Sequence, residues 1–107
     1  MKYLTLLAAL FAFTANANTL TVYTYESFVA EWGPGPQIKK AFEAECNCEL
    51  KFVGLGDGAT ILNRVQFEGA SSSADVVLGL DTNLMAAAEA TGLLAPSGID
   101  QGALALP

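Results

Sequence analysis

The order of hydrophobic and polar residues along the chain predicts strands that alternate with helices. Three runs rich in β-branched, aromatic or aliphatic residues predict strands: residues 20–24, 49–53 and 74–80. Helices are predicted after them, from apolar spacing in the first two cases and from helix-start residues in the third: residues 36–44, 59–68 and 82–91. This alternation is typical of parallel β-α-β units with right-handed crossovers. The expected fold class is therefore α/β, with an open and mainly parallel sheet.

Glycine, proline and small polar residues separate these elements. Residues 25–36 are expected to form a loop that a Gly-Pro-Gly-Pro run closes, and Gly92 is expected to cap the last helix. The third run, residues 74–80, is almost continuously apolar, which favours a central strand covered on both faces. The periodicity is lost after Pro96, and three strands make a thin sheet. We therefore expect residues 18–107 to be the front end of a longer protein.

The first 17 residues have the three parts of a secretory signal peptide. Lys2 gives a positive start, an apolar run extends to Phe13, and small residues stand at the −3 and −1 positions before Asn18. The apolar run is too short to span a membrane. We therefore predict cleavage after Ala17, a mature chain that does not insert into the membrane, and a periplasmic location, where disulfides form.

Composition and charge exclude several classes of function. The formal net charge is −6, from five Lys and Arg against eleven Asp and Glu, which argues against binding to nucleic acids or anionic membranes. Histidine is absent, so Ser-His-Asp catalysis, Cys-His catalysis and His-ligated metal sites are excluded for this chain. We accordingly predict no catalytic residue, no metal site and no cofactor.

The residues that follow the predicted strands indicate the kind of ligand. In open α/β sheets, ligands bind beyond the carboxyl ends of the strands. Tyr25 and Trp32 follow the first strand, Asp57 and Gly58 follow the second, and Asp81 follows the third. These side chains are aromatic or acidic, and none is basic. Aromatic faces combined with carboxylates suit an organic cation, through cation–π attraction and Coulomb pairing.

The same residues also have purely structural interpretations. Tyr25 and Trp32 could pack the loop onto the rest of the domain. Asp57 and Asp81 could act only as N-caps of the helices that follow them. The sequence alone leaves both interpretations open.

Cys46 and Cys48 are separated by a single residue, between the first predicted helix and the second predicted strand. This pair lacks partners for a metal site and does not have the spacing of a redox motif. A local structural disulfide is the interpretation that we favour for an exported chain, with free thiols and redox chemistry as the alternatives.

The mature sequence also contains runs that are specific enough to compare with a known family. The runs are LTVYTY, WGPGP, KKAFEA, CNCEL, the pair Asp57-Gly58, LNR and ADVVLGLD, all between Leu20 and Asp81. Together they closely resemble the thiamine-binding periplasmic proteins of bacterial ABC importers, and the resemblance extends from about Leu20 to Ser97. It implies the type II periplasmic-binding-protein fold, in which two α/β lobes enclose thiamine and a membrane permease receives it. By this resemblance, residues 18–107 would be the N-terminal portion of the first α/β lobe, with the second lobe absent.

The resemblance also implies roles for individual residues. Tyr25 would lie against the rings of the ligand, Trp32 would be a second aromatic of the cleft, and Asp57 with Gly58 would contact the aminopyrimidine end. The ligands could include thiamine phosphate esters. Because the residues of the second lobe are absent, a chain of this length is expected to bind thiamine weakly or not at all.

Other functions fit parts of the pattern. A polyamine receptor of the same fold would also use carboxylates and aromatic rings, whereas an iron-binding version is disfavoured because histidine is absent. A secreted α/β enzyme would need a nucleophile, and the two cysteines lie away from the predicted strand ends.

Overall fold

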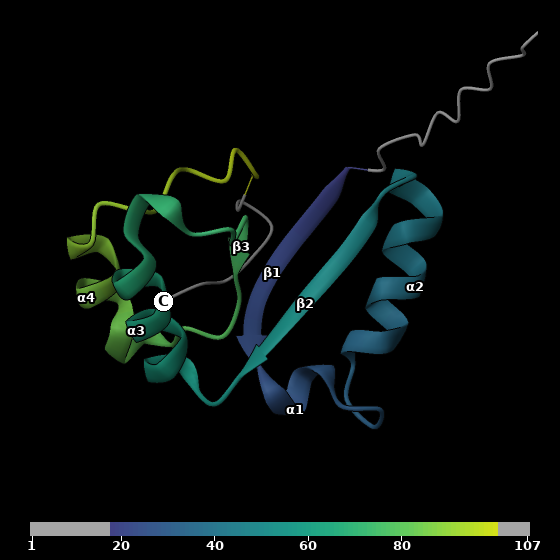
Figure 1. The fold of residues 1–107 in the computed structure, drawn as a ribbon, viewed down its shortest axis with the longest axis horizontal. Helices are drawn as coiled ribbons and strands as arrows, with labels where there is room; N and C mark the ends of the chain where they lie inside the picture. The colour runs from purple at the N-terminus through teal and green to yellow at the C-terminus, as the bar shows by residue number, and fades with distance from the viewer. Residues whose placement is uncertain (1–17, 101–107) are drawn as a thin grey trace, which may run out of the picture.

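The computed structural model describes residues 18–100, so the predicted signal peptide, residues 1–17, and the last residues, 101–107, lie outside the described part. Three parallel strands form one sheet in the order β2-β1-β3: β1 (Thr19–Tyr25), β2 (Glu49–Leu55) and β3 (Val76–Val77) (Figure 1). The helices are α1 (Glu26–Val29), α2 (Gly35–Cys46), α3 (Gly58–Glu68) and α4 (Met85–Ala90), with 3-10 turns η1 (Gly69–Ser71) and η2 (Thr82–Leu84). The α/β class and the open parallel sheet are confirmed.

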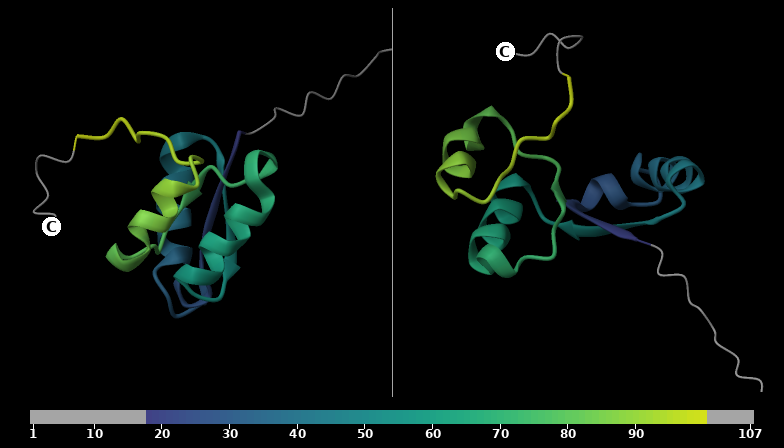
Figure 2. Two further views of the ribbon diagram at one scale, coloured as in Figure 1. Left: turned by 90° about the vertical axis from the view of Figure 1, so that its left-hand side faces the viewer. Right: turned by 90° about the horizontal axis from the view of Figure 1, so that it is seen from above.

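The two faces of the sheet carry different helices because side chains alternate along a strand. On one face Tyr23 is buried against Ile61 and Val65 of α3. On the other face Phe52 contacts Phe28 of α1 edge-on, with 5.7 Å between the ring centroids. In Figures 1 and 2, α2 and α3 lie on opposite sides of the β1–β2 pair.

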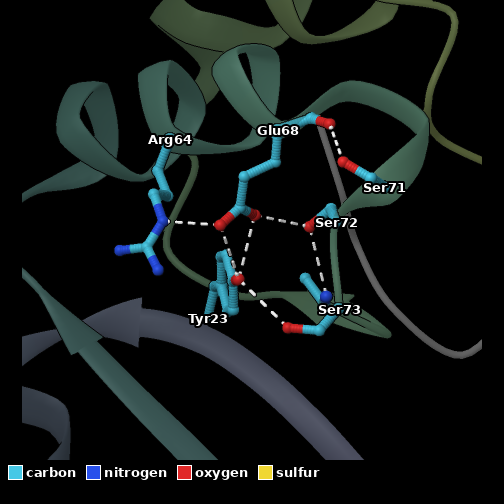
Figure 3. Close-up of polar contacts among 7 residues, drawn as sticks. Tyr23, Arg64, Glu68, Ser71, Ser72 and Ser73 are labelled. Carbon is cyan, nitrogen blue, oxygen red and sulfur yellow. Dashed lines mark hydrogen bonds and ion pairs between the residues drawn. The ribbon is translucent and has the colours of Figure 1, made fainter.

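A polar cluster joins β1 to the end of α3 and to the segment that leads into β3 (Figure 3). The hydroxyl of Tyr23 donates to the carboxylate of Glu68 at 2.9 Å and lies 3.3 Å from the hydroxyl of Ser73. Arg64 Nε and the Ser72 hydroxyl donate to the same carboxylate at 2.7 and 2.8 Å. The phenol of the buried tyrosine is therefore satisfied, as a buried polar group requires.

Two side chains of α2 bind the outer edge of β2. The Leu50 N–H donates to Glu43 at 2.7 Å, and Lys39 donates to the Leu50 carbonyl at 2.6 Å and to Glu43 at 2.8 Å. Because the neighbouring Glu49 N–H pairs with Asn18 on the β1 side, the Leu50 groups point away from the sheet. The hydrogen bonds from Lys39 and from the Leu50 N–H lower the pKa of Glu43.

The end of α2 is closed by a short covalent ring. Asn47 has the left-handed conformation (φ 53°) that ends many helices, and a disulfide joins Cys46 to Cys48 across it.

Within residues 18–100, none of the helices has the length and apolar character needed to cross a membrane.

The segment between β1 and α2 differs from the predicted loop. It contains α1, a single helical turn with no periodic pattern of its own. Phe28 of this turn packs between Tyr25 and Phe52. The proline and glycine residues of this segment predicted irregular structure. The helical turn is stabilised instead by contacts of the folded chain, which the local sequence does not encode.

The strand predicted over residues 74–80 and the helix predicted over residues 82–91 are both shorter in the structure. β3 has two residues and is an edge strand of the sheet that the described residues form, and Val76 and Leu78 remain 41% and 40% exposed. The prediction of a central strand covered on both faces is therefore wrong for the described part of the chain. Gly79, with φ of +116°, turns the backbone out of the strand direction, and the following helix divides into η2 and α4.

Candidate functional site

The carboxyl ends of the strands meet at one edge of the sheet, where β1 and β2 both point toward α1 (Figure 1). Tyr25, the last residue of β1, is in register with Leu55, the last residue of β2. Asp57 follows two residues later and begins α3. The parallel register therefore brings two of the predicted site residues to the same edge.

Tyr25 is half-buried, and neighbouring aromatic rings fix its position. Its ring meets Phe28 edge-on, with 5.8 Å between centroids and 76° between ring planes. Phe28 in turn meets Phe52, so the row of rings reaches β2. Such edge-to-face pairs are favourable beyond the area that they bury. Tyr25 as a residue remains partly exposed at this edge.

Asp57 is the N-cap of α3 and is also exposed. The backbone N–H and the hydroxyl of Thr60 both donate to Asp57 Oδ1 at 2.8 Å. These bonds, the backbone one first, lower the pKa of Asp57, so the carboxylate is ionised at neutral pH. The structural interpretation of this residue is therefore right as far as it goes. Neither bond uses the second oxygen, Oδ2, which can accept from a ligand.

Gly58 lies where the backbones of two loops approach each other. A Cβ atom added to it would be 2.8 Å from the carbonyl oxygen of Gly79 and 3.0 Å from Leu84 Cδ1. Any larger residue at this position would force the loop after β3 to move. Gly58 therefore permits close approach to a neighbouring loop, in addition to any role toward a ligand.

Trp32 is 80% exposed, and none of the contacts described for residues 18–100 joins it to Tyr25 or Asp57. The adjacent Gly33 fits against the backbone of α1, because a Cβ there would overlap the Ser27 carbonyl oxygen and lie 2.8 Å from that of Phe28. The loop backbone is thus packed, whereas the Trp32 side chain is largely exposed.

Asp81 caps η2 by accepting from the N–H groups of Asn83 and Leu84 at 2.9 and 3.2 Å. No basic side chain occurs in the segments at the strand ends, residues 25–32, 56–58 and 78–83, and among the described residues no group of three or more potential metal ligands is found. The edge is accordingly acidic and aromatic, as the sequence suggested.

The sequence did not reveal two residues at this edge, Phe28 and Gly79. Phe28 occupies a segment without a periodic pattern, so its role depends on the folded contacts with Tyr25 and Phe52. Gly79 interrupts an apolar run, and that interruption is a usable signal for a close backbone approach.

Comparison with known proteins gives several close relatives, although no protein-family model matches the chain. A thiamine-binding periplasmic protein of Escherichia coli is 64% identical over 88 residues, which cover 82% of this chain and 27% of that protein. One from Salmonella typhimurium is 58% identical over 106 residues, which cover 99% of this chain and 32% of that protein. A solved structure of a periplasmic thiamin binding protein matches with a TM-score of 0.82 at 56% identity, over 94% of this chain and 31% of that one.

These similarities first define a class: the chain has the fold of an α/β lobe of a periplasmic binding protein. Within that class it is a relative of the thiamine-binding periplasmic proteins, so the resemblance of the sequence to that family is confirmed. The chain spans about a third of the length of the curated relatives that it matches.

Proposed function

We propose that this chain forms part of a periplasmic receptor that binds thiamine and delivers it to the membrane permease of an ABC importer. The observation that carries the proposal is the position of Tyr25 and Asp57 at one edge of the sheet, where the segments at the strand ends, residues 25–32, 56–58 and 78–83, contain no Lys or Arg. The names of the relatives support thiamine as the organic cation, a periplasmic location, and a binding rather than a catalytic role.

The chemistry of thiamine fits these side chains. Its thiazolium ring is a flat cation and its aminopyrimidine ring carries hydrogen-bond donors. Tyr25, which is partly exposed at the carboxyl end of β1, would provide an aromatic surface for stacking or cation–π contact. The ionised Asp57 provides Oδ2 as a charged acceptor for the amino group. Gly58 allows the ligand to approach the backbone, and Trp32 would join the site by movement of its exposed side chain.

The test uses two variants of Asp57 in the protein expressed from its complete reading frame. Serine retains the N-cap of α3, whereas alanine removes it. Because both variants lose the charged acceptor, calorimetric titration should show thiamine binding weakened by about ten- to a hundredfold in each. Thermal unfolding should show Asp57→Ser close to wild type and Asp57→Ala less stable.

The outcomes separate the role of Asp57 from the function itself. Wild-type affinity in Asp57→Ser would reduce Asp57 to a helix cap and leave the aromatic residues as the ligand contacts. Spermidine is the competing ligand, since it is cationic but has no aromatic ring. A wild-type protein that binds spermidine and not thiamine would overturn the proposal in favour of a polyamine receptor.

A further inference from the structure

Gly79 lies directly against the ring of Tyr25. A Cβ atom added to Gly79 would be 2.7 Å from Tyr25 Cδ1 and 3.0 Å from Tyr25 Cε1, both closer than ordinary van der Waals contact. It would also lie 3.6 Å from Ile61 Cδ1, in the core beneath the ring. The absence of a side chain at this position is therefore what allows the ring to occupy its present place.

A second neighbour also restrains the ring. Phe28 packs against it edge-on, and Phe28 is itself held by Phe52 of β2. A methyl group at Gly79 would therefore tilt the ring or displace the loop that carries the glycine, and that loop is also restrained by Gly58. The ends of all three strands meet at this point: Tyr25 is the last residue of β1, Gly58 follows β2 and Gly79 follows β3.

We propose that Gly79 is a positioning residue for the ligand site: it sets the orientation of the Tyr25 ring and does not itself contact the ligand. The inference rests on the proposed function, in which Tyr25 supplies the aromatic surface for thiamine. It assigns a role to a residue outside the set that the sequence predicted. Its consequence is that Gly79 and Tyr25 act as one unit in binding.

A double-variant cycle tests this in the protein expressed from its complete reading frame. We expect Gly79→Ala and Tyr25→Ala each to weaken thiamine binding by about three- to tenfold, the range for loss of one aromatic contact. We expect the double variant to bind no more weakly than Tyr25→Ala alone, because the ring that the methyl group displaces is already gone.

Gly92→Ala is the control for replacing a glycine of positive φ away from Tyr25. Gly79 has φ of +116°, where alanine is strained whatever its neighbours, so strain weakens Gly79→Ala equally with or without the Tyr25 ring, and the double variant separates strain from packing. Gly92 also has a positive φ, +68°, but a Cβ atom there would meet nothing within 4 Å. Its replacement should cost some stability and leave the affinity for thiamine unchanged. Equal loss of affinity in the two glycine variants would show that strain, and not packing against Tyr25, is responsible, and would overturn the inference.

Two further outcomes remain distinguishable. Additive losses in the double variant, with wild type binding thiamine, would overturn the inference while the proposed function stands. Failure of the wild type to bind thiamine would overturn the proposed function instead.

If Gly79→Ala does not fold, the folding of the double variant decides. A double variant that folds supports packing of Gly79 against Tyr25, and a double variant that does not fold contradicts the inference.

Discussion

Thr24 shows how much a single side chain in β1 can cost. Thr24 is fully buried, yet its hydroxyl has no hydrogen-bond partner within the described residues. A buried hydroxyl without a partner loses its contact with water and gains nothing in return. Its neighbour Tyr23 is almost as deeply buried and avoids this cost through Glu68 and Ser73. Of these two adjacent buried residues, Tyr23 therefore has a hydrogen-bonded hydroxyl and Thr24 does not.

Thr24→Val should therefore leave the free energy of unfolding unchanged or raise it by about 1 kcal/mol, because valine has nearly the same shape and no polar atom. Urea denaturation followed by circular dichroism measures the change. Thr19→Val, at the exposed start of β1, is the control and should have little effect. A loss of stability in Thr24→Val larger than in the control would mean that the Thr24 hydroxyl has a partner that stabilises the fold.

At the scale of elements, the cluster around Glu68 ties three separate segments together. Glu68 ends α3, and its carboxylate accepts from Tyr23 of β1, from Arg64 one turn earlier, and from Ser72 after η1. These bonds, with Arg64 contributing most, lower the pKa of Glu68. The position of the chain entering β3 therefore depends on a negative charge.

Stability should follow the ionisation of that charge. Because the folded-state pKa of Glu68 lies below the unfolded one, its contribution is full above the unfolded pKa and is lost as pH falls through the folded pKa. Glu68→Gln should be less stable than wild type at pH 7, and the difference should shrink as pH falls below about 4.3. Thermal unfolding between pH 7 and pH 3 measures this.

Glu45→Gln on the exposed side of α2 is the control for general charge effects. Its difference from wild type should vary little over the same range. A Glu68→Gln variant whose destabilisation stays constant with pH would contradict the role of the ionised carboxylate.

The elements that sequence predicted best are those with local signals. Proline at the start of α2 and Asp57 before α3 mark helix starts, and both helices begin within a residue of the predicted position. The extent of β3 was not predictable in the same way, because an apolar run indicates burial but not which backbone groups pair. The contact between Gly79 and Tyr25 joins residues far apart in sequence, so no local pattern encodes it.

The sheet formed by residues 18–100 has two outer strands, β2 and β3, and β2 is the longer of the two. The backbone groups on such an edge can pair with a strand of any other molecule, and this is a common route to aggregation. At Leu50 both groups are already occupied by Glu43 and Lys39 of α2. The helix thus blocks strand addition at this point through Lys39 and Glu43, which also form an ion pair with each other.

Replacing both Lys39 and Glu43 by alanine should therefore increase concentration-dependent self-association, which sedimentation velocity measures. The control is the double replacement of Lys40 and Glu45, which removes the same two charges from α2 and leaves Leu50 covered. Equal association of the two double variants would attribute the effect to charge alone. In that case the Lys39–Glu43 pair stabilises only the helix. Greater association of the Lys39 and Glu43 double variant would instead show that this pair limits self-association of the protein at high concentration.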